Sequence, residues 1–478
     1  MLLRMLYDDR LAQAAYLIGC QKSGEAIVID PERDVDRYIA LAAENGLRIV
    51  AAAETHIHAD FLSGSRELAE QTGCRVYLPG QGGPDWSYGW IDGKQGGGSY
   101  DATLLHDGDT FKVGNIEFRA VHTPGHTPEH VMYAVTDLGG GATEPIGIAT
   151  GDFVFVGDLG RPDLLESAAG QVGVKEGFAR QLHKSAEGFM DLPDYLQVWP
   201  AHGAGSACGK ALGAVPMSTV GYEKRFNASL AHAGQEEKFV DFILSGQPAP
   251  PLYFARMKQQ NRDGVPLLGP VPQPRQLSTA NLAAIDGQKT AIVDTRAWDT
   301  FRKGHLPGSL WSPTTVQFPM VTGSYIEPND EIVLVCEPHL VDELTRVLVR
   351  IGLDRIIGWV SPADVAAAKT LETTPEITAE AFKGHETERP VLDVRNEHEH
   401  AAGAIRDAIN IAHTRLAPRV DELPKGEPIV CHCRSGVRSA AATAFLRREG
   451  FDVTNLAGGF IAWERAGGKI ERDQATSV

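Results

Sequence analysis

Histidine and aspartate side chains follow four apolar segments of the chain, at the positions where predicted strands end. His56, His58 and Asp60 come directly after the apolar run 47–53. Three further segments end in the same way, with His126 after 116–121, Asp152 after 146–151 and His202 after 198–200. Runs of this kind predict buried strands, and an open α/β sheet places its site at the carboxyl ends of strands. Because imidazole and carboxylate are ligands for zinc and iron, we expect a metal site built from these strand ends.

A simpler interpretation is that the two neighbouring histidines are ordinary core or surface residues. A His-x-His pattern on its own is a weak signal. That interpretation explains the pair but not the carboxylate and the other histidines at the same kind of position, so the metal site is favoured.

The order of these motifs resembles the metallo-β-lactamase superfamily over residues 1–250. The resemblance implies an α/β chain whose N-terminal part is an αββα sandwich. Most members carry His-x-His-x-Asp-His and hold two zinc ions, whereas Phe61 follows Asp60 here. This departure, with the segments 59–64 and 151–164, is similar to the persulfide dioxygenases, which hold a single iron. Carried over by position, the resemblance implies one Fe²⁺ per chain on His56, His126 and Asp152.

The neighbours of this triad are expected to support it. A face of two histidines and one carboxylate leaves open positions for substrate and oxygen. His58 and Asp60 are predicted to hold a ligand imidazole or a metal-bound water in orientation. His202, which binds the second metal in the two-zinc relatives, is predicted to orient a neighbour or the substrate.

Two further residues near the predicted site have open roles. Arg161 lies in a Gly-Arg-Pro turn, where its guanidinium could bind a substrate anion or pair with Asp158 or Asp163. Cys208, six residues after His202, could take up sulfane sulfur or be an inert buried thiol.

Composition narrows the choice of partners. The chain of 478 residues predicts about three domains, and its net charge of −17 argues against nucleic acid or anionic membrane surfaces as partners. No run approaches the roughly 20 apolar residues of a membrane span, and the N-terminus lacks the apolar core of a signal peptide. Six scattered cysteines are too few for a disulfide framework. We expect a cytoplasmic protein, and a homo-oligomer is left open.

The second half of the chain contains an internal repeat. A proline-rich region, 251–275, is predicted to be a linker after the first domain, 1–250. Beyond it, 291–296 (AIVDTR) recurs as 390–395 (PVLDVR), and Gly304 recurs as Gly403 at the same offset. Each unit alternates strands and helices, which predicts a small parallel sheet. Both units resemble the rhodanese domain, with predicted boundaries of 276–372 and 373–478.

The second unit carries a cysteine loop with the features of a sulfur-transfer site. Residues 433–439 (CRSGVRS) lie between a predicted strand and a predicted helix, so successive backbone N–H groups form an anion cradle. The cradle should favour the thiolate of Cys433 and stabilise a persulfide on it. Arg434 and Arg438 add positive charge for sulfite or thiosulfate.

The corresponding loop of the first unit lacks these features. It begins CEPHLVDE at Cys336, without glycine or arginine, and Pro338 removes one N–H donor. The nearby acidic residues would repel an anion. We predict a silent structural unit, with a residual sulfur-carrying role for Cys336 as the alternative.

Together these features predict a persulfide dioxygenase fused to a sulfurtransferase, acting in sulfide detoxification. The resemblance implies that the first domain oxidises a low-molecular-weight persulfide, glutathione persulfide in the first instance, with O₂ to sulfite. Cys433 would exchange sulfane sulfur with sulfite and thiosulfate. One alternative is a zinc-dependent thioester hydrolase of the glyoxalase II kind fused to a sulfurtransferase. The other is a sulfur carrier for a partner, in which the first domain is a non-catalytic scaffold.

Overall fold

The computed structural model describes the chain except residues 168–172, 248, 279–284 and 473–478. Two compact units are present, one of residues 1–271 with 349–352 and one of residues 272–348 with 353–478. Among the described residues, no helix has the length and apolar character needed to span a bilayer.

The first unit is built on two six-stranded sheets. In the first sheet β1 to β3 are antiparallel and β3 to β6 are parallel. Its strands are β1 (Leu2–Asp8), β2 (Gln13–Cys20), β3 (Glu25–Ile29), β4 (Arg48–Ala53), β5 (Arg75–Pro79) and β6 (Ala102–Leu105). The second sheet has the order β12-β11-β10-β9-β8-β7, in which only β10 and β11 are parallel. Its strands are β7 (Thr110–Val113), β8 (Ile116–His122), β9 (Val131–Asp137), β10 (Gly147–Gly151), β11 (Gln197–Pro200) and β12 (Ser218–Thr219).

Alternation along the strands explains how the two sheets pack. In β2, Tyr16 and Ile18 belong to the cluster shared with the second sheet, whereas Ala15 and Leu17 pack with the helices on the opposite face. Side chains two residues apart point to the same face of a strand, so a strand apolar on both faces must be covered on both.

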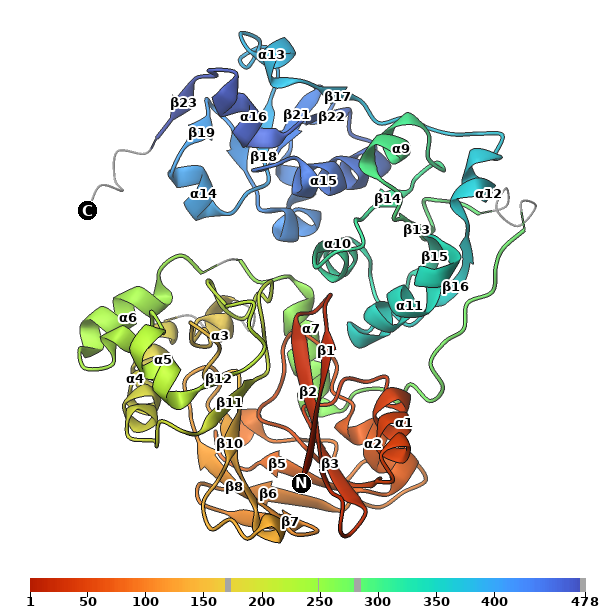
Figure 1. Cartoon of the computed structure of the whole chain (residues 1–478). Coiled ribbons are helices and arrows are strands. Elements are labelled where there is room, and N and C mark those ends of the chain that lie inside the picture. The colour runs from red at the N-terminus through yellow and green to blue at the C-terminus, as the bar shows by residue number, and fades with distance from the viewer. Residues whose placement is uncertain (168–172, 248, 279–284, 473–478) are drawn as a thin grey trace. The chain divides into compact units, whose positions relative to one another are not determined.

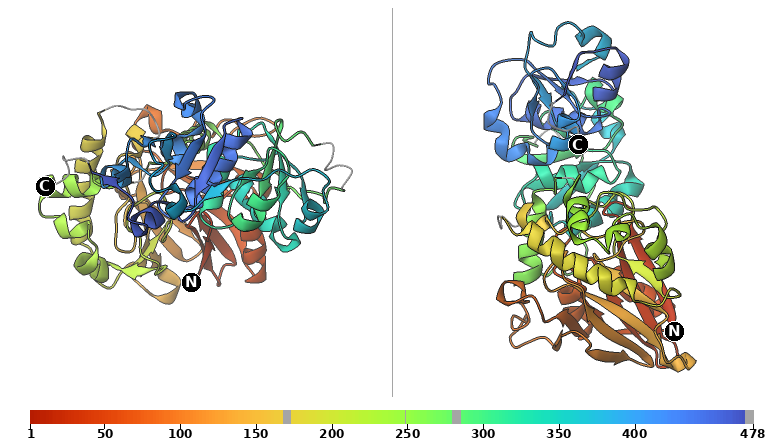
Figure 2. Two further views of the ribbon diagram at one scale, coloured as in Figure 1. Left: turned by 90° about the horizontal axis from the view of Figure 1, so that it is seen from above. Right: turned by 90° about the vertical axis from the view of Figure 1, so that its left-hand side faces the viewer.

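Helices cover the outer faces. Helices α1 (Asp36–Glu44) and α2 (Ser65–Thr72) pack on the first sheet, and α4 (Lys175–Met190) and α6 (Glu236–Leu244) pack on the second. Figure 2 (right) shows α4, in yellow, lying along the orange strands of the second sheet. The other helices of this unit are α3 (Leu164–Ser167), α5 (Val220–Phe226) and α7 (Tyr253–Asp263). The predicted αββα sandwich is therefore confirmed.

The structure departs from the sequence-based expectations at one domain end. The stretch predicted as a linker, 251–275, contains α7, whose residues Tyr253, Phe254 and Met257 are buried. The first unit thus continues to Val271 rather than ending at residue 250. The high proline content on both sides of α7 concealed a helix that packs by its apolar face.

The second unit contains two parallel sheets, as the internal repeat predicts. The first has the order β14-β13-β15-β16 and the second the order β17-β22-β21-β18-β20, and every pairing in them is parallel. The strands are β13 (Thr290–Asp294), β14 (Leu310–Trp311), β15 (Glu331–Val335), β16 (Ile356–Val360), β17 (Glu376–Ile377), β18 (Val391–Asp393), β20 (Ile409–Asn410), β21 (Ile429–His432) and β22 (Val453–Leu456), with β19 (Ala404–Ile405) and β23 (Ile470–Glu471) forming a separate pair. The helices are α9 (Trp298–Lys303), α10 (Gln317–Tyr325), α11 (Val341–Arg350), α12 (Pro362–Ala366), α13 (Ala379–Phe382), α14 (Glu397–Ala401), α15 (Val437–Arg448) and α16 (Gly459–Arg465).

The repeated Asp-x-Arg element has the same structure in both halves. Arg296 pairs with Asp294 at 2.6 Å and donates to the carbonyl of Gly304, and Arg395 repeats both contacts with Asp393 and Gly403. In both halves the carbonyl of the recurring glycine accepts from the arginine.

Candidate metal centre and sulfur-transfer loop

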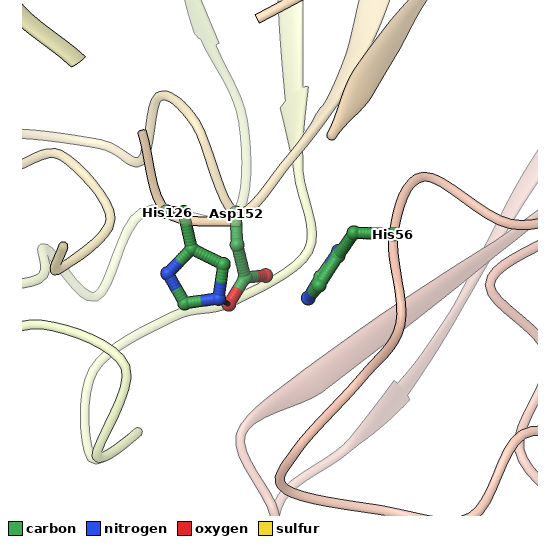
Figure 3. A group of neighbouring side chains, drawn as sticks. All are labelled: His56, His126 and Asp152. Atoms are coloured by element: carbon green, nitrogen blue, oxygen red, sulfur yellow. Dashed lines mark ion pairs between the residues drawn. The ribbon is translucent and has the colours of Figure 1, made fainter. Parts of the chain in front are cut away.

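Three of the predicted ligands converge at the ends of β4, β8 and β10. The ligand atoms of His56, His126 and Asp152 lie within 4.8 Å of one another, and all three side chains are buried. Figure 3 shows the two imidazoles and the carboxylate pointing toward a common centre. His126 Nε2 is 3.4 Å from Asp152 Oδ2. Neither carboxylate oxygen of Asp152 has a hydrogen-bond partner among the described residues. Buried, converging and unpaired donor atoms fit a metal ion, so the predicted grouping is present.

The imidazoles are held in the tautomer that a metal requires. His126 Nδ1 donates to the carbonyl of Arg161 at 3.0 Å, and His56 Nδ1 lies 3.0 Å from Thr55 Oγ1. Each ring is thereby left with Nε2 for the metal. Burial lowers the pKa of both histidines, which keeps the rings neutral. Burial opposes ionisation of Asp152, but the neighbouring ring of His202, whose own pKa is raised, holds the pKa of Asp152 well below the usual range.

His58 turns away from this centre. Its Nε2 lies 3.1 Å from Asp30 Oδ1 and 3.1 Å from Glu54 Oε2, and these carboxylates outweigh burial and raise its pKa well above the usual value. Asp30 also accepts hydrogen bonds from Thr55 N and Thr55 Oγ1. His58 therefore pairs with Asp30 and Glu54 beside the loop that carries His56.

Phe61 follows Asp60, at the position where the resemblance to the superfamily implies a further ligand in the two-zinc relatives. Its side chain is fully buried and packs on the His58 ring, with the centroids 4.4 Å apart. The aromatic ring fills the space with carbon and offers no donor atom.

The remaining predicted residues lie on the far side of Asp152. His202 Nε2 is 3.3 Å from Asp152 Oδ1 and 3.3 Å from Asp60 Oδ2, and Cys208 joins Asp60 and His202 in a second group of potential ligands. Burial raises the pKa of the Cys208 thiol to about 12. Burial therefore favours the protonated form of this thiol.

Arg161 forms an ion pair with Asp163. Its Nε and Nη2 donate to Asp163 at 2.8 and 2.6 Å, and Nη1 donates to the carbonyl of Ala207. Its own carbonyl accepts from His126, so Arg161 supports the metal centre through its backbone.

Three residues that support the ligands were not found by sequence reasoning. His130 Nε2 accepts from the backbone N–H of Asp152 at 3.0 Å, and Glu129 accepts from the backbone N–H of Ile57 at 2.8 Å. Burial lowers the pKa of His130 to about 3 and raises that of Glu129 to about 7. The third, Asn261 on α7, donates to the carbonyls of His58 and Phe61 and accepts from Ser63 N. The spacing of four residues between His126 and His130 could have indicated the role of His130. No pattern in the sequence indicated Asn261, which lies in the predicted linker.

The glycine-rich loop 82–99 is anchored by its aromatic residues. Trp86, Tyr88 and Trp90 are each about 5% exposed and belong to the core beside the first sheet. Tyr88 and Trp90 line a small cavity of about 10 Å³ with His56 and His58, which is room for about one water molecule. These three side chains therefore pack in the core of the first unit.

The cysteine loop of the second repeat has the predicted form. Cys433 follows β21, and its Sγ accepts from Gly436 N at 3.2 Å and lies 3.6 Å from Ser439 Oγ. Helix α15 begins at Val437 after Gly436, whose φ of +98° is easily adopted only by glycine. Arg434 is exposed.

Arg438 has a partner that the sequence did not reveal. Glu399 binds its guanidinium through both carboxylate oxygens at 2.7 and 2.8 Å. The positive charge that Arg438 brings to the loop is therefore partly neutralised.

Cys336 in the first repeat lies in a different environment. Burial, with Glu337 and Asp294 nearby, raises the pKa of its thiol to about 12. A proline at position 338 begins a short 3₁₀ helix in place of the glycine-rich cradle. These facts support the interpretation of this unit as silent.

Comparison with known proteins agrees with the fold and the site. The family model described as the metallo-beta-lactamase superfamily matches residues 8–202, and that of the rhodanese-like domain matches 279–357 and 374–466. A solved metallo-beta-lactamase from Staphylococcus aureus subsp. aureus COL is 41% identical, with a TM-score of 0.66, over 76% of this chain and 99% of that one. The chain belongs to the metallo-beta-lactamase superfamily. Its C-terminal half is a rhodanese-like region in two segments.

Two relatives of named activity also match the first half. Human mitochondrial persulfide dioxygenase ETHE1 is 30% identical over 203 residues, 42% of this chain and 68% of the human protein. A hydroxyacylglutathione hydrolase from Gloeobacter violaceus is 32% identical over 188 residues, 39% of this chain and 62% of that protein.

Proposed function

We propose that the chain is a persulfide dioxygenase fused to a sulfurtransferase. The observation that carries the first activity is the triad of His56, His126 and Asp152, combined with Phe61 at the position of a further ligand. A ferrous ion bound there would supply adjacent positions for O₂ and the persulfide sulfur. The overall reaction is RSSH + O₂ + H₂O → RSH + SO₃²⁻ + 2H⁺.

The residues of the chain have defined roles in this proposal. His56 and His126 present neutral imidazoles, and Thr55 and the Arg161 carbonyl fix their orientation. A groove of about 360 Å³ includes His202 and Tyr7 in its wall, which is room for a small thiol persulfide such as glutathione persulfide. His202 is in the wall of this groove, and its Nε2 lies 3.3 Å from Asp152 Oδ1.

The second activity uses Cys433. A persulfide on its sulfur would lie against Gly436 N and Ser439 Oγ, whose donors favour the anion. Attack by sulfite on the outer sulfur gives Cys-SS⁻ + SO₃²⁻ → Cys-S⁻ + S₂O₃²⁻. Sulfite made in the first domain would thus become thiosulfate in the second, which links the two reactions.

Oxygen uptake tests the first activity. Anaerobically iron-reconstituted protein should consume O₂ on addition of glutathione persulfide and release sulfite or thiosulfate, and His126→Ala should not. Absence of uptake in protein with bound iron would refute the dioxygenase. The linkage is tested separately, because Cys433→Ser should raise the ratio of sulfite to thiosulfate, and an unchanged ratio would refute it.

The competing function is zinc-dependent thioester hydrolysis, favoured by the likeness to hydroxyacylglutathione hydrolase. Zinc-loaded protein that hydrolyses an acylglutathione while iron-loaded protein takes up no O₂ would establish it instead.

A further inference from the structure

One short segment of the first unit comes from far along the chain. Residues 349–352 belong to that unit, although its main part ends at Val271. The segment contains Arg350, which is the last residue of α11 and is buried. A charged side chain that is buried without partners is costly, so the contacts of Arg350 indicate what the segment does.

The guanidinium of Arg350 joins two parts of the first unit. Its Nε and Nη2 donate to Asp34 at 2.8 and 2.6 Å, and its Nη1 donates to Asp8 at the end of β1. Glu32 Oε2 lies 3.7 Å from Nε. Burial opposes the charge, but Asp34 and Asp8 outweigh it and raise the pKa of Arg350 above its ordinary value. The planar fork of the guanidinium thus ties residues 32–34 to β1.

The backbone of the same segment binds the loop that carries the metal ligand His56. We call residues 56–64 the metal loop. Leu62 N, in this loop, donates to the carbonyl of Arg350 at 2.7 Å. The carbonyls on either side of it accept from Arg33 at 3.2 Å and from Arg256 at 3.0 Å. The last carbonyls of a helix lack partners within the helix, and here they are capped by donors of the first unit.

Residues 30–34 also contact the metal loop directly. Gly64 N donates to the carbonyl of Pro31 at 2.7 Å, and Glu32 pairs with Ser63 in an antiparallel bridge. A Cβ on Gly64 would lie 2.3 Å from the carbonyl oxygen of Glu32, so only glycine allows the two backbones to come this close. Arg350 therefore acts on the end of the metal loop from two directions, through its own carbonyl and through the residues that its guanidinium holds.

A chain of hydrogen bonds continues from this segment to the first metal ligand. Asp30 accepts from Thr55 N at 2.7 Å and from Thr55 Oγ1 at 2.9 Å. Thr55 Oγ1 in turn lies 3.0 Å from His56 Nδ1. The orientation of the His56 ring thus depends on where residues 30–34 lie.

We propose that Arg350 is a positioning residue for the metal centre. Its carbonyl fixes Leu62, and its guanidinium fixes the residues against which the metal loop and Thr55 are ordered. Arg350 touches none of the three ligands, so it acts only through these neighbours. The inference rests on the metal triad of the proposed function, but it does not depend on which reaction the metal performs.

Cobalt binding by full-length, metal-free protein tests the proposal, because Co²⁺ reports the geometry of its ligands in its visible spectrum. Arg350→Lys keeps the charge but loses the fork that binds Asp34 and Asp8 together. Its affinity for Co²⁺, measured against a chelator of known affinity, should fall by about tenfold or more. The visible bands of the bound cobalt should also change in intensity, because the His56 ring is no longer held in one orientation.

Arg447→Lys is the matched control. Arg447 follows Cys433 at the same distance in sequence as Arg350 follows Cys336, so the two arginines are equivalent in the repeat. Arg447 is partly exposed and lies 3.6 Å from Asp452. Cobalt affinity and spectrum should both equal those of the wild type in this variant.

A second variant tests the same contact from the other side. Asp34→Asn keeps Arg350 and should also weaken cobalt binding. In the double variant the loss should be smaller than the product of the two single losses, because both changes break one contact. Losses that multiply would overturn the proposal, since the two residues would then act independently.

A purely structural role gives a different result. Arg350→Lys would then melt at a lower temperature, but the folded protein would bind cobalt within threefold of the wild type and with an unchanged spectrum, which would overturn the proposal. If Arg350→Lys does not fold, Asp34→Asn decides alone, and cobalt binding like that of the wild type would overturn it. Oxygen uptake is a separate measurement, so failure of the dioxygenase is distinguishable from failure here.

Discussion

Replacement of Asn261 by alanine should weaken metal binding although Asn261 binds no metal. The side chain is 3% exposed and makes three hydrogen bonds of 2.7–2.8 Å to the backbone of the loop that follows His56. Asn261→Ala leaves two carbonyls and one N–H unpaired. Each buried unpaired group costs about 1–3 kcal/mol, so the three together should lower the stability of the ordered loop by at least about 3 kcal/mol. Water that enters and replaces the lost hydrogen bonds would reduce this cost.

Part of this lost stability should appear as weaker binding of the metal. Replacing groups that orient metal ligands typically lowers affinity by about 10–100-fold. We expect a fall of this size for iron, or for cobalt as its substitute, in competition with a chelator of known affinity. Gln259→Ala is the matched control, because Gln259 is exposed on the same helix and touches no part of the loop in the described contacts. An affinity of Asn261→Ala within about threefold of the wild type, in protein that melts normally, would refute the reasoning.

Three further changes test other parts of the structure. Glu399→Gln removes the anionic partner of Arg438. The KM for thiosulfate in sulfur transfer should then fall severalfold at low salt, because the positive charge of Arg438 is no longer neutralised. An unchanged KM would mean that Arg438 does not face the substrate. Cys336→Ser should leave the rate of sulfur transfer unaltered, since burial holds the pKa of that thiol near 12, and a large loss would show that it carries sulfur. Burial lowers the pKa of His305 to about 4 from an ordinary value of 6.5. The unfolded chain therefore binds more protons between these values, and the free energy of unfolding should fall by up to about 3 kcal/mol as the pH drops from 6.5 to 4. In denaturation followed by tryptophan fluorescence, His305→Asn should reduce this dependence of the unfolding free energy on pH. An unchanged pH dependence would show that other groups cause it.

The sequence was informative where a potential metal ligand follows a predicted strand, or where a motif recurs at the same spacing. Apolar runs predicted β4, β8 and β10, and the polar residues after them were placed together correctly because strand ends meet at one edge. The repeat was visible because the same Asp-x-Arg element and glycine make the same contacts twice.

Local pattern failed where a contact joins residues distant in sequence. Asp34 pairs with Arg350 at 2.6 Å, and no local pattern in the sequence indicates that partner. Helix α7 was hidden among prolines, and nothing in its spacing indicated that Asn261 reaches the carbonyls of His58 and Phe61.

The sequence by itself determined the ligand types, their placement at strand ends and the contrast between the Cys433 and Cys336 loops, because these depend on residue identity and short-range order. Only the tertiary structure decided which way each side chain faces. It turned His58 toward Asp30 and Glu54, committed Arg161 to Asp163, and brought Cys208 to Asp60 and His202. Those choices depend on which buried charges and donors meet across the packed sheets, and partners so far apart in the chain leave no periodic signal in the sequence.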